Sequence, residues 1–156
     1  MRCPPILPVL FIAAFIGGPA QVLWSQENPA DSTDPAALIG LTLGDLLNRF
    51  GMPQSVYAVR GLEDWQDDVV FVYPLGDFYV FRDRVWQLGL KSAYGIRIGD
   101  PRAAVELVLG DKAEVFGDHF LLSLPGKSWP LMLRVNLGGG GSAGAVSALF
   151  VYRPDF

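Results

Sequence analysis

The sequence predicts an α+β protein built from two tandem repeats, each a short helix packed on an antiparallel four-stranded sheet. Two observations lead to this fold class. The hexapeptide GLTLGD at residues 40–45 recurs as GIRIGD at residues 95–100, with glycine, aliphatic and aspartate residues at the same positions. Each copy precedes a short helical pattern, which is followed by segments rich in β-branched and aromatic residues. We therefore divide the domain into residues 38–94 and 95–156.

Residues 1–25 have the features of a secretory signal peptide. Arg2 precedes the apolar run ILPVLFIAAFI at residues 6–16, and small residues follow it. We expect cleavage after Ala20 or Ser25. The alternative is an uncleaved membrane anchor, because the uncharged stretch approaches the roughly 20 residues that span a bilayer. Residues 26–37 are polar and acidic and contain two prolines, which is typical of a flexible linker.

Charge and cysteine content exclude several classes of partner. The formal net charge is −4, and the basic residues are scattered singly, so we expect no nucleic-acid binding and membrane contact only through an uncleaved leader. The single cysteine, Cys3, lies in the leader and would leave with it. A disulfide-free exported chain fits a bacterial envelope, either the periplasm or the outside of the cell.

Each predicted helix begins and ends at residues that favour a helix terminus. Asp45 and Asp100 are expected to cap the two helices through their carboxylates. Pro101 occupies the first helical position of the second helix, where its missing N–H has no consequence. Gly51 and Gly110 are expected to end the helices.

The segments after each helix are expected to form strands. Their connections are mostly too short for parallel crossovers, so the strands should pair in antiparallel order with the helix across one face. Tyr79 and Phe81 are expected to face away from Phe78 and Val80. In residues 84–90, the alternation places on one face Trp86, Leu88 and Leu90. The expected strands cover residues 55–60, 68–74, 77–81 and 84–90, then 113–116, 119–124, 130–137 and 145–152.

These patterns allow a resemblance to be named. The glycine- and aspartate-containing hexapeptide before a short helix, together with FYVFRDRVWQLGL at residues 78–90, resembles the repeat of the β-lactamase-inhibitor-protein-like superfamily. That superfamily includes the SmpA/OmlA outer-membrane assembly lipoproteins, and the likeness covers residues 38–152. It implies an envelope or secreted protein that binds other proteins across its sheet and has no catalytic centre. The chain lacks the disulfides of the inhibitors and the lipidated cysteine of the lipoproteins, so neither specific function carries over.

Strings that look like catalytic or cofactor motifs fail on their context. GGSAG at residues 140–144 matches a nucleophile elbow and, with its neighbours, a dinucleotide fingerprint, but no histidine follows and the chain ends too soon. PGKS at residues 125–128 is followed by Pro130, which bars the helix of a phosphate-binding loop. His119 is the only histidine and is expected to be structural. We expect no cofactor, metal or catalytic residue.

The acidic segment EDWQDD at residues 63–68 is predicted to be a solvated loop. It lacks the glycine and the chelating glutamate of a calcium loop, which leaves at most a weak cation or basic-partner site. Trp65 within it is a candidate recognition residue. A hydrolase using dispersed carboxylates would draw on Asp64, Asp67 and Asp68.

The remaining candidates are aromatic residues on predicted strands. The leading hypothesis is an exported, non-enzymatic module that binds an envelope or secreted protein through an aromatic sheet face and the acidic loop around Trp65. The alternative is a small-ligand or cation-binding periplasmic protein that uses the cleft between the repeats, and the hydrolase is third. The expected partner-binding residues are Trp65, Tyr57, Tyr73, Tyr79, Phe81 and Trp86.

Overall fold

The computed structural model describes residues 34–60, 67–126, 128–139 and 144–156. The expected leader, most of the expected linker, Trp65 and the GGSAG serine therefore lie outside the described residues. Within the described ranges, neither α-helix is long and apolar enough to cross a membrane.

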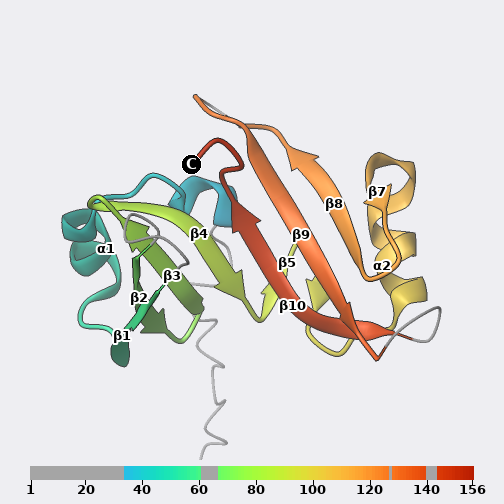
Figure 1. Cartoon of the computed structure of the whole chain (residues 1–156), viewed down its shortest axis with the longest axis horizontal. Coiled ribbons are helices and arrows are strands. Elements are labelled where there is room, and N and C mark those ends of the chain that lie inside the picture. The colour runs from blue at the N-terminus through green and yellow to red at the C-terminus, as the bar shows by residue number, and fades with distance from the viewer. Residues whose placement is uncertain (1–33, 61–66, 127, 140–143) are drawn as a thin grey trace, which may run out of the picture.

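Eight strands form one antiparallel sheet, which confirms the α+β class (Figure 1). Its spatial order is β1-β2-β3-β4-β10-β9-β8-β7. The two expected sets of four strands are therefore joined into one continuous sheet where β10 pairs with β4. This pairing removes two long strand edges from solvent. The strands are β1 (Ser55–Val59), β2 (Asp68–Tyr73), β3 (Gly76–Phe81), β4 (Arg84–Leu90), β7 (Glu114–Val115), β8 (His119–Leu124), β9 (Leu131–Gly138) and β10 (Ala145–Tyr152).

Two α-helices, α1 (Leu43–Phe50) and α2 (Arg102–Leu109), lie at opposite ends of the sheet (Figure 1). A small ladder of β5 (Ser92–Ala93) and β6 (Ile96–Arg97) precedes α2, and the 3-10 turn η4 (Gly110–Lys112) follows it.

Regular structure begins earlier than the sequence predicts. The 3-10 turn η2 (Pro35–Leu38) includes the last three residues of the expected linker. The carboxylate of Asp34 accepts a 3.0 Å hydrogen bond from the N–H of Ala36 at its start. Leu38, the first residue of the expected first repeat, is fully buried, and its burial holds the end of this turn against the core.

The core lies between the helices and one face of the sheet. Leu46 of α1 and Val105 and Leu109 of α2 are buried against strand residues of that face. One row of paired residues crosses its middle, and their side chains share the helix-covered face. This row consists of Phe71, Phe78, Leu88, Val151 and Leu133.

The helix caps differ from the prediction. Thr42, not Asp45, is the N-cap of α1: its hydroxyl accepts from the N–H of Asp45, and the Asp45 carboxylate accepts from the N–H of Thr42, each at 3.0 Å. This reciprocal pair is a capping box. The N-cap of α2 is Pro101, which has no side-chain cap. Asp100 instead accepts a 2.7 Å hydrogen bond from the N–H of Arg97, inside a turn.

The two hexapeptides do not occupy equivalent places. Gly40 N–H donates to the carbonyl of Val85, and Gly99 N–H donates to the carbonyl of Val146, both at 2.8 Å. The glycines with matching hydrogen bonds are thus 40 and 99, which are 59 positions apart, whereas the hexapeptides are 55 apart. The N-caps at 42 and 101 and the helix-ending glycines at 51 and 110 show the same spacing of 59.

A β-bulge changes the predicted faces of β4. Tyr79 pairs with Gln87 and Val80 with Val85, which leaves Trp86 as the extra residue. Because the extra residue shifts the alternation, Val85 joins Leu88 and Leu90 in the core. The prediction that Trp86 shares a face with Leu88 and Leu90 is wrong.

Candidate functional site

The sheet face opposite the helices is the candidate site. Residues paired directly across antiparallel strands place their side chains on the same face. One row on this face consists of Tyr57, Val70, Tyr79, Gln87, Tyr152, Met132 and Ser123. The neighbouring row consists of Ser55, Val72, Asp77, Gly89, Phe150, Arg134, Leu121 and Glu114. We call these two rows, with Phe81 and Trp86, the open face.

Four of the six expected partner-binding residues belong to the open face: Tyr57, Tyr79, Phe81 and Trp86. Their rings are half-buried, except that Tyr57 is 43% exposed. The buried helix residues among the described part of the chain pack against the other face. Tyr79 and Phe81 point away from the core as the alternation predicts, because Phe78 and Val80 are the buried residues of β3.

Tyr73 is in the core, so its assignment to the partner-binding set is wrong. Its side chain is 3% exposed and packs edge-on against Phe78 and at a tilt against Phe50 of α1. Its hydroxyl donates a 3.1 Å hydrogen bond to the carbonyl of Gly51, just after the helix. The ring therefore supports the packing of α1 on the sheet.

An aromatic cluster covers one end of the open face. Trp86 stacks on Phe156 with ring centroids 6.0 Å apart, and Phe81 meets Phe156 edge-on at 5.7 Å. Tyr79 meets Trp86 edge-on at 6.5 Å. The guanidinium of Arg153 lies 5.1 Å from the Phe156 ring centroid. Aromatic rings beside an arginine are typical of protein-binding surfaces.

The middle of the first half combines tyrosines with a carboxylate. The Tyr57 hydroxyl donates to Asp77 Oδ2 at 3.5 Å. Burial raises the pKa of Tyr57, and the charge of Asp77 adds to this effect. Burial also raises the pKa of Tyr79, with Tyr57 and Asp77 contributing. Both hydroxyls stay protonated at neutral pH, and the single O–H of Tyr57 is directed at Asp77.

A groove of about 270 Å³ lies where β4 meets β10. Gly89 lies at its floor, because a Cβ built there would come within 3.5–3.7 Å of Phe150, Asp77 and Tyr79. The groove therefore lies where the two halves of the sheet join. Its lining residues are Gly76, Asp77, Tyr79, Gly89, Leu90, Lys91, Ile98, Ser147, Ala148, Leu149 and Phe150.

The predicted site residues do not include Phe150 and Tyr152, which belong to the open face, or Phe156, which stacks on it. Phe150 and Tyr152 alternate along β10 with the buried Leu149 and Val151. This alternation is the pattern that predicted the direction of Tyr79 and Phe81. Nothing local in the sequence indicates that Phe156 stacks on Trp86.

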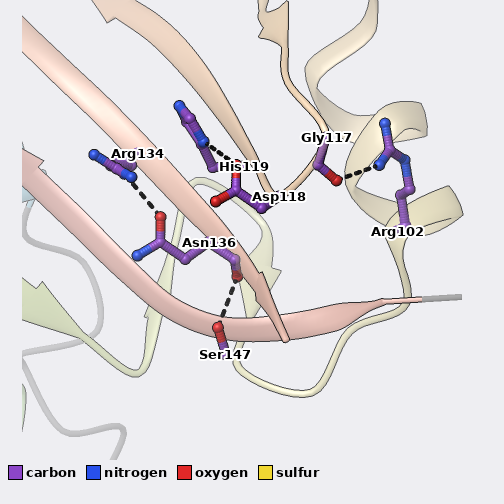
Figure 2. Close-up of polar contacts among 7 residues, drawn as sticks. All are labelled: Arg102, Gly117, Asp118, His119, Arg134, Asn136 and Ser147. Carbon is purple, nitrogen blue, oxygen red and sulfur yellow. Dashed lines mark hydrogen bonds and ion pairs between the residues drawn. The ribbon is translucent and has the colours of Figure 1, made fainter. Parts of the chain in front are cut away.

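His119 takes part in a small polar cluster at the other end of the sheet (Figure 2). Its Nδ1 lies 2.7 Å from Asp118 Oδ1, and its ring stacks on Phe116. This contact with His119 lowers the pKa of Asp118. The nearby Ser147 hydroxyl donates to the backbone carbonyl of Asn136. These contacts lie around the β7–β8 turn.

Of the carboxylates proposed for a hydrolase, the described residues include Asp67 and Asp68. Asp67 lies 3.8 Å from the guanidinium of Arg60 at the surface. Asp68 accepts a 2.9 Å hydrogen bond from Trp86 Nε1. Neither lines the groove at Gly89 or the smaller one between Asp34 and Trp129. In the described ranges, no group of three or more histidine, cysteine or carboxylate side chains could hold a metal ion.

The fold and the open face define an α+β protein with one helix-covered and one aromatic sheet face. No family model and no curated protein matches the chain. The structure is similar to the crystal structure of a cysteine-rich secretory protein from Staphylococcus aureus subsp. aureus Mu50, with 11% sequence identity and a TM-score of 0.46. The match covers 80% of this chain and 47% of that one, so the chain spans about half the length of that protein.

Proposed function

We propose that this chain is an exported, non-enzymatic protein of the bacterial envelope that binds a protein partner through its open face. The observation that supports this most is the gathering of Tyr57, Tyr79, Phe81 and Trp86 on the face that the helices leave uncovered. Large rings with few rotamers contribute contact area at a low entropy cost. Export rests on the signal-peptide pattern of residues 1–25 alone.

We further propose that the two halves are tandem repeats of the β-lactamase-inhibitor-protein-like kind. The matching backbone hydrogen bonds of Gly40 and Gly99 and the common spacing of 59 support this origin. So does the mirrored order of four strands on either side of the β4–β10 pair. In that superfamily partners bind across the sheet, which is the surface proposed here.

The test is capture of a partner from an envelope extract by the immobilised protein without its leader. Tyr79→Ser together with Trp86→Ser should abolish capture of a protein that the wild type retains. Two controls should retain it: Leu107→Ser, which removes an 86% exposed side chain from α2, and Tyr73→Phe, which changes only a core hydroxyl. If the double variant folds and captures the same protein equally well, the proposed face is wrong.

The groove at Gly89 favours one second candidate, a small-ligand-binding protein. Its volume of about 270 Å³ is close to the lower limit of ligand pockets, and Asp77 and Lys91 place opposite charges at its rim. A small molecule that raises the melting temperature of the wild type, combined with failure to capture any protein, would favour this function over the first.

A further inference from the structure

Strand β1 forms one end of the sheet and pairs only with β2. All of its residues, Ser55–Val59, are exposed. No other segment within the described ranges forms a backbone hydrogen bond with its outer edge. Alternate N–H and C=O groups of β1 therefore face outward, in the pattern that an additional strand would satisfy.

The two edges of the sheet differ in how they are protected. The far edge, β7, is only two residues long and carries Glu114. Short, charged edges resist pairing with another chain. Strand β1 has the sequence SVYAV, with no charge and no proline, and its register with β2 runs without a bulge. It lacks the features that block strand addition.

The side chains along this edge are apolar on both faces. Val56, Tyr57, Val59 and the neighbouring Val69 of β2 are 37–51% exposed. Tyr57 lies on the open face and Val56 on the opposite face, because neighbouring strand residues alternate. A strand added here would bury apolar surface on both sides of the sheet.

The charges around β1 indicate which kind of strand fits. Asp68 pairs with Val59 on the open-face side, and Asp77 accepts from Tyr57. Arg60, which follows β1, lies 3.8 Å from the carboxylate of Asp67 and is matched by that charge. Asp68 lies two strand spacings, about 10 Å, from the backbone of an added strand, which is within reach of a lysine or arginine side chain. A second copy carries the same net charge of −4, so charge complementarity favours a basic segment over a second copy.

We propose that β1 is a docking edge for an extended segment of the partner protein, in which apolar residues alternate with lysine or arginine. This inference rests on the proposed protein-binding function and states how the partner engages. Main-chain hydrogen bonds to β1 provide affinity. The basic side chains of the added strand lie on the open-face side near Asp68, and its apolar side chains pack beside Val56.

The test uses an end-blocked peptide of alternating valine and lysine as the probe. Binding to the protein without its leader is followed by NMR, through amide hydrogen exchange and chemical shifts. At saturation, alternate amides of Ser55–Val59 should exchange at least tenfold more slowly. The same peptide N-methylated at alternate backbone nitrogens should not bind, and a valine–glutamate peptide should bind at least tenfold more weakly.

Two lysine substitutions form a matched pair. Val59→Lys, on the exposed edge beside Asp68, should weaken binding of the lysine peptide at least fivefold. Val115→Lys, on the exposed opposite edge, should leave it unchanged. Absence of binding at millimolar peptide, equal binding of the N-methylated peptide, or protection at Glu114–Val115 instead would overturn the inference.

Failure of this inference is distinguishable from failure of the proposed function. If the peptide does not bind while Tyr79→Ser with Trp86→Ser still abolishes partner capture, the partner uses the open face without adding a strand. If the peptide protects β1 but that double variant captures the partner normally, the strand-docking edge stands and the proposed role of the open face is wrong.

Discussion

Trp86 Nε1 donates a 2.9 Å hydrogen bond to Asp68 Oδ1, which links β4 to β2 across the intervening strand β3. Tyr79 of β3 lies edge-on to the Trp86 ring beside this link. Burial raises the pKa of Asp68, and the hydrogen bond from Trp86 opposes this effect without cancelling it. The carboxylate positions Trp86 on the open face at some cost to the stability of the charged folded state.

Replacement of Asp68 by asparagine should therefore raise stability at neutral pH. The pKa of Asp68 is higher in the folded state than in the unfolded state. At a pH between these two pKa values the folded state binds more protons, so the free energy of unfolding falls as pH rises through this range. Asparagine cannot ionise, and its carbonyl can still accept from Trp86. We expect Asp68→Asn to melt above the wild type at pH 7 and at the same temperature as the wild type near pH 3.

A carboxylate with the opposite shift is the control for this pH dependence. The side chain of Arg153 lowers the pKa of Asp155 through hydrogen bonds of 2.9 and 3.1 Å. The contribution of Asp155 to stability is present above its pKa in the unfolded state and is lost as pH falls through its pKa in the folded state. Asp155→Asn should thus melt below the wild type at pH 7 and converge with it in acid. A pH-independent difference for Asp68→Asn would contradict the assigned shift.

The capping box stabilises the N-terminus of α1, whereas α2 has no side-chain cap at its N-terminus. Thr42→Ala removes the hydroxyl that accepts from Asp45 N–H and should lower the free energy of unfolding by about 1 kcal/mol. Thr42→Ser should retain most of it. Pro101→Ala should not show this loss, because Pro101 provides no side-chain cap to α2. Urea unfolding of the three variants tests the assignment, and a loss for Thr42→Ser equal to that for Thr42→Ala would refute it.

Gly40 should be the less replaceable of two glycines with positive φ. At Gly51, with φ of 72°, a Cβ would meet nothing within 4 Å, so Gly51→Ala should cost only the backbone strain, roughly 1–3 kcal/mol. At Gly40, with φ of 88°, a Cβ would lie 2.5 Å from Trp129 Cζ2. We expect a loss at least about 1 kcal/mol larger for Gly40→Ala. Similar losses at both positions would mean that the Trp129 ring moves aside freely.

Much of the fold could be predicted because it is encoded locally. The strands follow from β-branched and aromatic segments with short connections, and the outward direction of Tyr79 and Phe81 follows from alternation along β3. The same alternation also predicts the outward direction of Phe150 and Tyr152. The pairing of β4 with β10, which joins the halves, could not be predicted, because strand pairing over such sequence separation leaves no local pattern.

The errors at single residues have distinct physical causes. The bulge at Trp86 is one extra residue in β4, and a period-two pattern cannot show where an extra residue falls. Tyr73 is the last residue of its strand, and the strand pattern alone does not show whether its ring is exposed. In the structure Phe50 of α1 packs against the ring and covers it. The two hexapeptides are alike in residue types but do not occupy equivalent places in the fold. The equivalent places are marked by the hydrogen bonds of Gly40 and Gly99, which depend on pairing with β4 and β10.

The floor of the groove at the β4–β10 junction has room for a Cβ atom at Gly89. A Cβ at Gly89 would meet Phe150, Asp77 and Tyr79 at ordinary contact distances of 3.5–3.7 Å. Valine is favoured in strands, and glycine in a strand interior costs roughly 0.5–1 kcal/mol, so Gly89→Val should unfold at the same or a higher urea concentration than the wild type.

Binding by the same variant then tells whether the groove is used. If the partner inserts a side chain there, Gly89→Val should reduce partner capture at least tenfold at unchanged stability, because its methyl groups occupy the floor of the groove. Gly117→Val is the matched control, since Gly117 lies in the β7–β8 turn with open space around it. Undiminished capture by a stable Gly89→Val protein would confine the interface to the rings around Trp86 and to the β1 edge.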